Sequence, residues 1–128
     1  MGPLRHTLTK AERLSGKTSI DNLISRGKYF SAGCVRCCYL FRDLASPGTI
    51  PGEAAVTRIL VSVPKRHFKR AVKRNLLKRR IREAYRLQKE ILGDRVMDLM
   101  FVYTSREVLP YEEIRSSVEA VLRHLASK

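Results

Sequence analysis

Hydrophobic and polar residues follow a helical spacing between residues 71 and 92. With about 100° between successive residues, one arc of the helix holds the mostly apolar positions Leu77, Ile81, Ala84, Gln88, Ile91 and Leu92. The opposite arc holds Asn75, Lys78, Arg79, Arg82, Arg86 and Lys89. The spacing predicts one amphipathic helix with a side for a core and a basic side, stopped by Gly93 and Asp94.

Two arginines fall outside the basic arc of this helix. Arg80 projects beside Leu87 and Ile91, and Arg74 lies at the apolar edge. For Arg80 we expect the stem to lie along apolar surface while the guanidinium reaches water. Arg74 is close to the predicted start of the helix, where a neighbouring loop could share its charge with a ligand.

Three segments have the pattern of strands. Residues 33–43 are rich in Val, Cys, Tyr and Phe, and alternate residues fall on opposite sides. Residues 55–63 alternate in the same way, and residues 97–104 form a short apolar run. Between the first two strands, residues 45–53 contain two prolines and two glycines and predict a loop. The simplest pairing of these two strands is an antiparallel hairpin with a long loop.

A short helix is predicted early in the chain and another at its end. Residues 20–26 form the first, which Thr18 or Ser19 could cap and which Gly27 ends as a C-cap. Pro110 opens the last helix as its first residue. The apolar stripe of that helix consists of Ile114, Val118, Val121, Leu122 and Leu125.

These elements predict an α+β fold, in the order αββ(β)αβα. The strand at 55–63, the helix at 71–92 and the strand at 97–104 can form a βαβ unit, whose default crossover is right-handed. A two-layer sandwich results, with helices covering one side of the sheet and the other side a candidate open face. A length of 128 residues fits one domain over residues 1–128, in which residues 1–16 form an extended N-terminal arm.

The charge of the chain indicates an anionic partner. Twenty-six Lys and Arg residues against 12 Asp and Glu residues give a net charge of +14. Residues 65–82 contain ten Lys and Arg residues and no Asp or Glu. Nucleic acid is the first candidate and an acidic membrane surface the second. The domain is therefore predicted to bind RNA or another polyanion.

Other patterns narrow the class of partner and the compartment. No apolar run could span a membrane or serve as a signal peptide, which predicts a cytoplasmic protein without a membrane partner. The apolar side of the basic helix lacks Trp and Phe anchors for a membrane surface. A strand and a loop precede the basic segment, where a DNA-binding regulator would place a short helix and a turn. We therefore expect no DNA partner.

No catalytic or metal-binding constellation is evident. Cys34 and Cys37 have the spacing of a zinc ligand pair, but in a strand they would point to opposite faces, and no second pair follows. The cysteines, Cys38 included, are interpreted as small hydrophobic residues, and their odd number disfavours a disulfide framework. The three histidines are scattered, without a visible carboxylate partner. The prediction is a binding protein with neither catalytic residues nor a metal site.

The basic segment resembles the signature region of the bacterial ribonuclease P protein subunit. In that family a small residue and a Lys-Lys step end a strand, and a helix carries an Arg-Asn-Arg core. Here residues 60–86 read LVSVPKRHFKRAVKRNLLKRRIREAYR. The matching residues are Ser62, Lys65, Arg66, Arg74, Asn75, Lys78, Arg79, Arg82, Glu83 and Tyr85. Residues 13–27 and 98–125 are similar to the family's first helix and to its final strand and helix.

The chain departs from the family pattern at four places. Leu76 stands where the family core has its second arginine. The loop before the helix is one residue longer. Ile20 and Ile24 stand where family members often have aromatic residues, and the basic pair after the last strand is reduced to Arg106.

The resemblance implies a specific function. The fold would be the family's α+β sandwich, whose βαβ crossover is left-handed. The protein would bind a large catalytic RNA, and the ribonucleoprotein would remove the 5′ leader of precursor tRNA. Mg²⁺ ions, held mainly by the RNA subunit, would perform the hydrolysis. The chain would be an accessory subunit of an endoribonuclease.

The resemblance also implies two sets of site residues. Those expected to contact the RNA subunit are Lys65, Arg66, Arg70, Lys73, Arg74, Asn75, Lys78, Arg79, Arg82 and Arg86. A groove for the single-stranded leader would use Ile20, Ile24, Arg36 and Tyr39. Strand alternation leaves open whether Tyr39 lies in the groove or in the core. The alternative function is a ribosomal or other structural RNA-binding protein.

Overall fold

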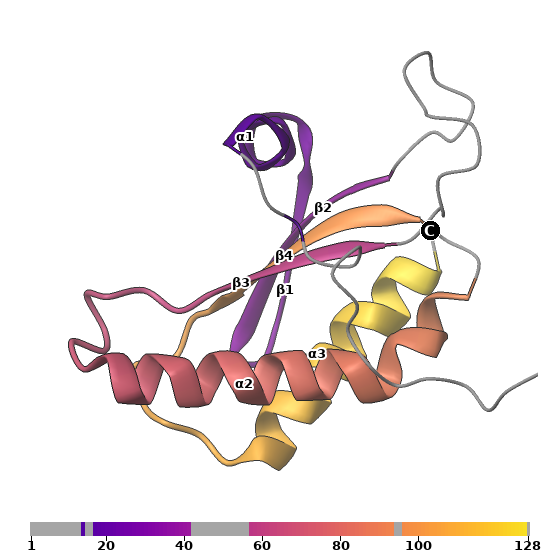
Figure 1. The fold of residues 1–128 in the computed structure, drawn as a ribbon. Helices are drawn as coiled ribbons and strands as arrows, with labels where there is room; N and C mark the ends of the chain where they lie inside the picture. The colour runs from indigo at the N-terminus through magenta and orange to yellow at the C-terminus, as the bar shows by residue number, and fades with distance from the viewer. Residues whose placement is uncertain (1–13, 15–16, 42–56, 94–95, 128) are drawn as a thin grey trace, which may run out of the picture.

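A computed structural model describes residue 14 and residues 17–41, 57–93 and 96–127. Its elements are α1 (Lys17–Arg26), β1 (Lys28–Ala32), β2 (Val35–Phe41), β3 (Arg58–Ser62), α2 (Ala71–Gln88), the 3₁₀ helix η2 (Lys89–Leu92), β4 (Met97–Tyr103) and α3 (Tyr111–Ala126). The helices α2 and α3 lie on one side of the sheet and α1 on the other (Figure 1). The predicted α+β fold is confirmed. No helix in the described part of the chain is both long and apolar enough to cross a membrane.

The four strands form one sheet in the order β1-β2-β4-β3. β4 pairs antiparallel with β2 and parallel with β3. The predicted hairpin between residues 33–43 and 55–63 is therefore wrong, because β4 lies between these strands. Most residues of β4 are buried, as expected for an apolar central strand. The predicted βαβ unit of β3, α2 and β4 is confirmed, and the hand of its crossover stays a prediction.

The strand pattern missed β1, which pairs antiparallel with β2. Its residues are mostly exposed or half-buried, so they show no clear apolar alternation. Gly33 and Cys34 connect the two strands, and Gly33 has a φ of 55°, as in the tight hairpin turns that favour glycine. A Cβ on Gly33 would lie 2.3 Å from Ser117 Oγ of α3. Glycine thus allows both the turn and its contact with α3.

Hydrophobic residues form two clusters, one on each face of the sheet. The larger cluster lies between the sheet and the pair α2 and α3, and it includes the α2 residues Leu77, Ile81, Ala84 and Tyr85. The predicted core side of this helix is confirmed. The smaller cluster joins Leu14 and Leu23 to Cys38 of β2. Leu14, which lies in the predicted arm, donates its backbone N–H to Ile59 O over 2.7 Å.

Several predicted boundaries shift by a few residues. α1 begins at Lys17, ahead of both predicted caps, Thr18 and Ser19. Gly27 does not have the positive φ of the predicted C-cap. A Cβ there would lie 2.4 Å from Leu23 O and 2.7 Å from Cys38 Sγ, so glycine allows the end of α1 to touch β2. Pro110 precedes the first residue of α3 instead of being it. The predicted loop at 45–53 lies outside the described residues.

Candidate nucleic-acid interface

The outer side of α2 carries a group of polar and basic side chains. Asn75, Arg79 and Arg82 are exposed, and Lys78 and Arg86 are half-buried. Together with Glu83 they line a shallow hollow of about 420 Å³. We call these five polar and basic residues the helical basic face. The structure thus brings together five of the six residues that the helical spacing places on one side; the sixth, Lys89, lies in η2 and does not line the hollow.

Arg86 of the helical basic face forms an ion pair with the neighbouring residue Glu83. The guanidinium of Arg86 donates to both carboxylate oxygens of Glu83. These hydrogen bonds lower the pKa of Glu83, which is therefore ionised at neutral pH. The positive charge of Arg86 is partly neutralised by the Glu83 carboxylate, whereas Arg79 and Arg82 project into solvent. Arg79 and Arg82 are the better candidates for phosphate contacts.

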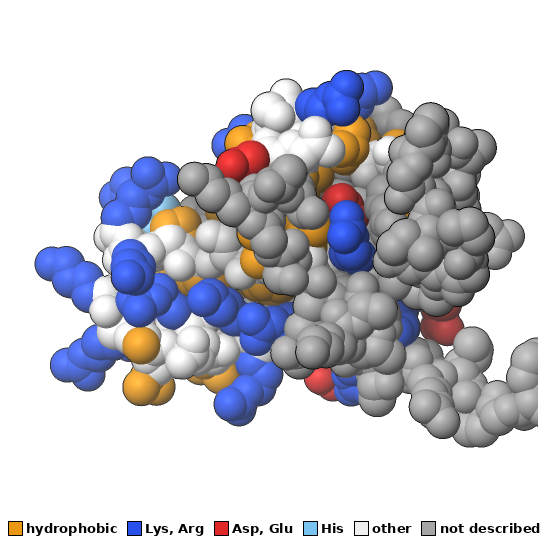
Figure 2. Space-filling model, turned by 45° about the horizontal axis from the view of Figure 1, so that its top comes forward, with side chains coloured by type: hydrophobic (Ala, Val, Ile, Leu, Met, Phe, Trp, Pro, Cys, Tyr) orange, Lys and Arg blue, Asp and Glu red, His pale blue; other side chains and the backbone are white. Residues whose placement is uncertain are grey.

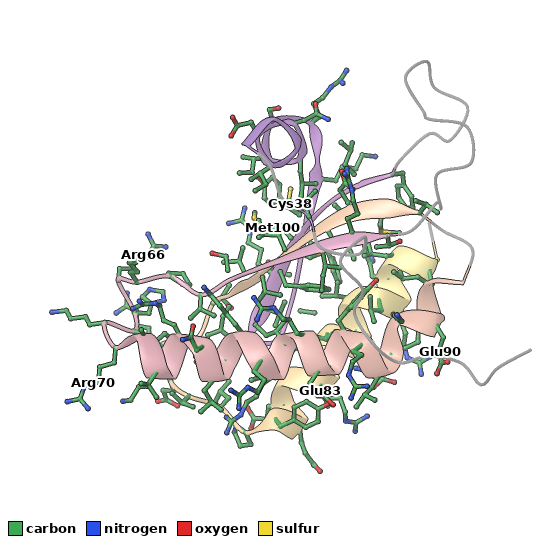
Figure 3. The ribbon with its side chains drawn as sticks, viewed as in Figure 1. Cys38, Arg66, Arg70, Glu83, Glu90 and Met100 are labelled. Atoms are coloured by element: carbon green, nitrogen blue, oxygen red, sulfur yellow. The ribbon has the colours of Figure 1, made fainter. Side chains whose placement is uncertain are left out.

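A basic loop over residues 64–70 leads into α2. Lys65, Arg66 and Arg70 are exposed, whereas Phe68 is buried in the main core. The Phe68 ring packs against Tyr103, with ring centroids 5.9 Å apart. In Figure 3 the labelled Arg66 and Arg70 extend away from the body of the molecule. One buried aromatic residue therefore anchors a loop whose basic side chains face outward.

The two arginines that broke the helical pattern fix loops to α2. Arg74 Nη1 donates to Phe68 O over 2.7 Å and to Lys69 O over 2.9 Å. Arg80 Nη1 donates to Leu109 O over 2.7 Å, which corrects the expectation that its guanidinium only reaches water. Arg74 therefore positions the basic loop, and its direct contact with RNA stays a prediction.

The structure adds to the basic surface two residues that were not among the predicted RNA contacts. His67 and Arg106 line a hollow of about 450 Å³ together with Arg66. Arg106 follows β4, so only the parallel pairing of β3 with β4 brings it beside the loop that follows β3. Figure 2 shows Lys and Arg side chains gathered at the left of the view, around the loop and the start of α2.

The other predicted site, on the sheet face beneath α1, needs one correction. Tyr39 is 4% exposed and belongs to the main core on the opposite face, so its predicted role in the groove is wrong. The register of β2 places Tyr39 on the same side as Val35 and Cys37. Arg36 and Cys38 face the α1 side, where Figure 3 shows Cys38 near Met100.

Tyr29 of β1 provides the aromatic ring that Tyr39 was expected to supply. It is 47% exposed and lies opposite Cys38 in the sheet register. The Arg36 guanidinium lies 4.6 Å from the centre of the Tyr29 ring, and the Tyr29 hydroxyl donates to Ile24 O. Ile24 is exposed and Ile20 half-buried on the neighbouring helix. This face thus combines an aromatic ring, a cation and apolar side chains.

The cysteines are packing residues. Burial raises the pKa of the Cys37 thiol to about 12, and the Cys38 thiol donates to Leu23 O. Cys34 lies in the turn and contacts the same core as Cys37, so the prediction that these two diverge is wrong. Cys37 and Cys38 are the pair that diverges. Among the residues that the structure describes, no three metal-ligating side chains come together.

A model of the ribonuclease P family matches residues 8–126. The chain belongs to the ribonuclease P family. It is 32% identical over 130 residues to the ribonuclease P protein component of Porphyromonas gingivalis strain ATCC 33277, with 97% of this chain and 90% of the relative covered. It is 33% identical over 135 residues to that of Chlorobaculum tepidum, with 95% and 84% covered.

Two solved RNase P proteins share the fold. The Staphylococcus aureus protein superposes with a TM-score of 0.71 at 22% identity, covering 90% of this chain and 95% of that one. The Thermotoga maritima protein gives a TM-score of 0.70 at 17% identity, covering 88% and 96%. Within this ribonuclease P family member, Leu76 is half-buried on α2, where the resemblance predicts an arginine.

Proposed function

We propose that this chain is the protein subunit of ribonuclease P. It binds the catalytic RNA through the helical basic face and the basic loop, and it holds the 5′ leader of precursor tRNA on the sheet face beneath α1. The observation that carries the proposal is the basic surface from Lys65 to Arg86 in a chain that belongs to this family. A regular helix and an anchored loop hold the exposed cations of that surface in place.

The helical basic face has the chemistry for structured RNA. Each Lys or Arg that meets a phosphate releases counterions, so binding is strong and depends on salt. The side chain of Asn75 can donate to and accept from a 2′-hydroxyl group, which cations alone cannot do. Because α2 is fixed against the core by Leu77 and Ile81, these groups are presented without a folding step.

The sheet face beneath α1 has the chemistry for a single strand. Single-stranded RNA is held by positive charge together with rings on which bases stack. Tyr29 supplies a ring, Arg36 a cation, and Ile20 and Ile24 apolar contact. In this proposal they replace the aromatic residues that the family often places on its first helix.

The side chains available indicate which tasks belong to the protein and which to the RNA subunit. Hydrolysis of the tRNA precursor is assigned to Mg²⁺ ions held mainly by the RNA subunit. The protein's own residues bind and orient the two RNA molecules. Neither the basic face nor the sheet face offers a paired base and nucleophile, and the buried thiol of Cys37 is protonated at neutral pH.

Reconstitution with a bacterial ribonuclease P RNA tests this function. At low Mg²⁺ concentration the wild-type protein should raise the rate of precursor tRNA cleavage over that of the RNA alone. Arg79→Ala combined with Arg82→Ala should reduce the stimulation, and Arg123→Ala on α3 should not. A protein that bound the RNA without changing cleavage would instead be a structural RNA-binding protein.

A further inference from the structure

A cleft lies between the basic loop and the segment that joins β4 to α3. It consists of two adjoining hollows that share His67 and Arg106. One, of about 530 Å³, is lined by residues 67–70, Lys73 and residues 106–108. The other, of about 450 Å³, is lined by Arg66, His67 and Arg106. We call the two hollows together the loop cleft.

Hydrogen bonds from side chains fix both walls of the loop cleft. Arg74 holds the basic loop through Phe68 O and Lys69 O, and Arg80 holds the other wall through Leu109 O. The hydroxyl of buried Tyr103 donates to Glu107 O and accepts from the Leu109 N–H. Because the walls are already ordered, little binding free energy is lost to ordering them when a ligand enters the cleft.

The lining of the loop cleft is not purely cationic. Arg66, Arg70 and Arg106 provide positive charge, which outweighs the one carboxylate of the lining, Glu107. Val108 provides an apolar side chain that is 38% exposed. The half-buried His67 adds a flat ring whose Nδ1 is buried without a hydrogen-bond partner. Phosphates of a double helix would use only the cations. A nucleotide matches all three features, because it joins an anion to a flat base with polar edges.

The position of the loop cleft indicates where that nucleotide comes from. Lys73 lines the cleft and belongs to the first turn of α2, two residues before Asn75 and five before Lys78, but it projects from the other side of the helix. Arg70, which directly precedes α2, also lines the cleft, so an RNA strand that runs along the helical basic face and past the start of α2 reaches it. A paired base has its polar edge occupied and is stacked on its neighbours, so the nucleotide must be unpaired.

We propose that the loop cleft binds one unpaired nucleotide of an RNA partner. Its phosphate lies at Arg66 and Arg106, and its base lies against Val108 and the His67 ring. The inference rests on the proposed function, because it assumes that RNA follows α2. It assigns a base-binding role to a surface that would otherwise serve only to attract phosphates.

The ¹⁵N-labelled full chain, titrated with the four nucleoside 5′-monophosphates, ribose 5-phosphate and inorganic phosphate, tests the proposal. At least one nucleotide should shift the amide signals of His67 and Val108 and bind about tenfold more tightly than ribose 5-phosphate, the affinity that one stacked base supplies. Arg106→Ala should weaken binding of every ligand. Val108→Ser should weaken only the nucleotides, and Arg123→Ala on α3, outside the cleft and the helical basic face, should change none.

Three results would overturn the proposal. If ribose 5-phosphate or inorganic phosphate bound as tightly as every nucleotide, the cleft would be an anion site without a base contact. If no ligand shifted His67 or Val108, the cleft would bind none of them. If Val108→Ser lost phosphate binding as well, the assignment of the base to this wall would be wrong. Binding of the wild-type chain to the ribonuclease P RNA is measured separately. A failure of the proposed function would appear in that measurement and is thus distinguished from a failure of the nucleotide site.

Discussion

Apart from Arg86, which pairs with Glu83, the arginines of α2 divide into two kinds by the direction in which the helix projects them. Arg79 and Arg82 project into solvent, whereas Arg74 and Arg80 donate to loop carbonyls. The guanidinium group suits both tasks because it has five N–H donors and a long apolar stem. The side chains that look misplaced on the helical pattern are thus the ones that hold the loops beside the basic face.

Replacing Arg80 by Met tests its structural role. The variant keeps an apolar stem but leaves Leu109 O without its donor, so the free energy of unfolding should fall by about 1–3 kcal/mol. Arg79→Met, which removes an exposed guanidinium from the same helix, should stay within about 0.5 kcal/mol of wild type. Urea denaturation measures both. Equal stabilities for the two variants would contradict the assigned hydrogen bond.

Two tyrosines on neighbouring strands should behave in opposite ways when replaced by Ala. Tyr39→Ala empties part of the core and should lower the free energy of unfolding by about 3–5 kcal/mol, as for other large buried side chains. Tyr29→Ala should leave stability nearly unchanged. It should weaken holoenzyme binding of precursor tRNA by about 1–3 kcal/mol while sparing mature tRNA. Thermal melting and tRNA binding assays measure these effects, and equal losses for both tRNA forms would exclude a leader contact at Tyr29.

At the scale of elements, the amphipathic helix was predictable and the strand order was not. The spacing of Leu77, Ile81 and Ala84 alone fixes which side of α2 is buried. Strand alternation separates Tyr39 from Arg36 but cannot say which side meets the helices. The strand pattern missed β1 because the residues of β1 are largely exposed or half-buried. The strand order was not predictable because β4 lies between β2 and β3 through pairings between residues distant in sequence.

The hairpin of β1 and β2 gives a prediction at this scale. Gly33→Ala introduces a side chain at a φ of 55° and also drives a Cβ against Ser117, so the free energy of unfolding should fall by about 2–5 kcal/mol. Gly93→Ala meets a similar φ of 62° with no neighbouring atom within 4 Å and should lose about 1–2 kcal/mol. Urea denaturation compares them, and equal losses would contradict the close contact of the turn with α3.

At the scale of the whole molecule, one sheet separates two surfaces with different chemistry. The helices α2 and α3 lie on one side of the sheet and α1 on the other (Figure 1). The side of α2 and α3 carries the helical basic face, and the side of α1 carries Tyr29 and Arg36 beside apolar residues. The loop cleft lies at the end where α2 begins. The sequence alone predicts the basic surface, because it is local, whereas Arg106 and Tyr29 join their sites only through the sheet.

The salt dependence of RNA binding tests the central claim, that the helical basic face contacts the phosphates of the ribonuclease P RNA. For Arg79→Ala with Arg82→Ala, the slope of log K against log salt should become shallower by about 1.4–1.8, which corresponds to two lost phosphate contacts. Arg123→Ala on α3 should leave the slope unchanged, and all three proteins should unfold at similar urea concentrations. A double variant that bound the RNA with unaltered affinity and slope would contradict the account.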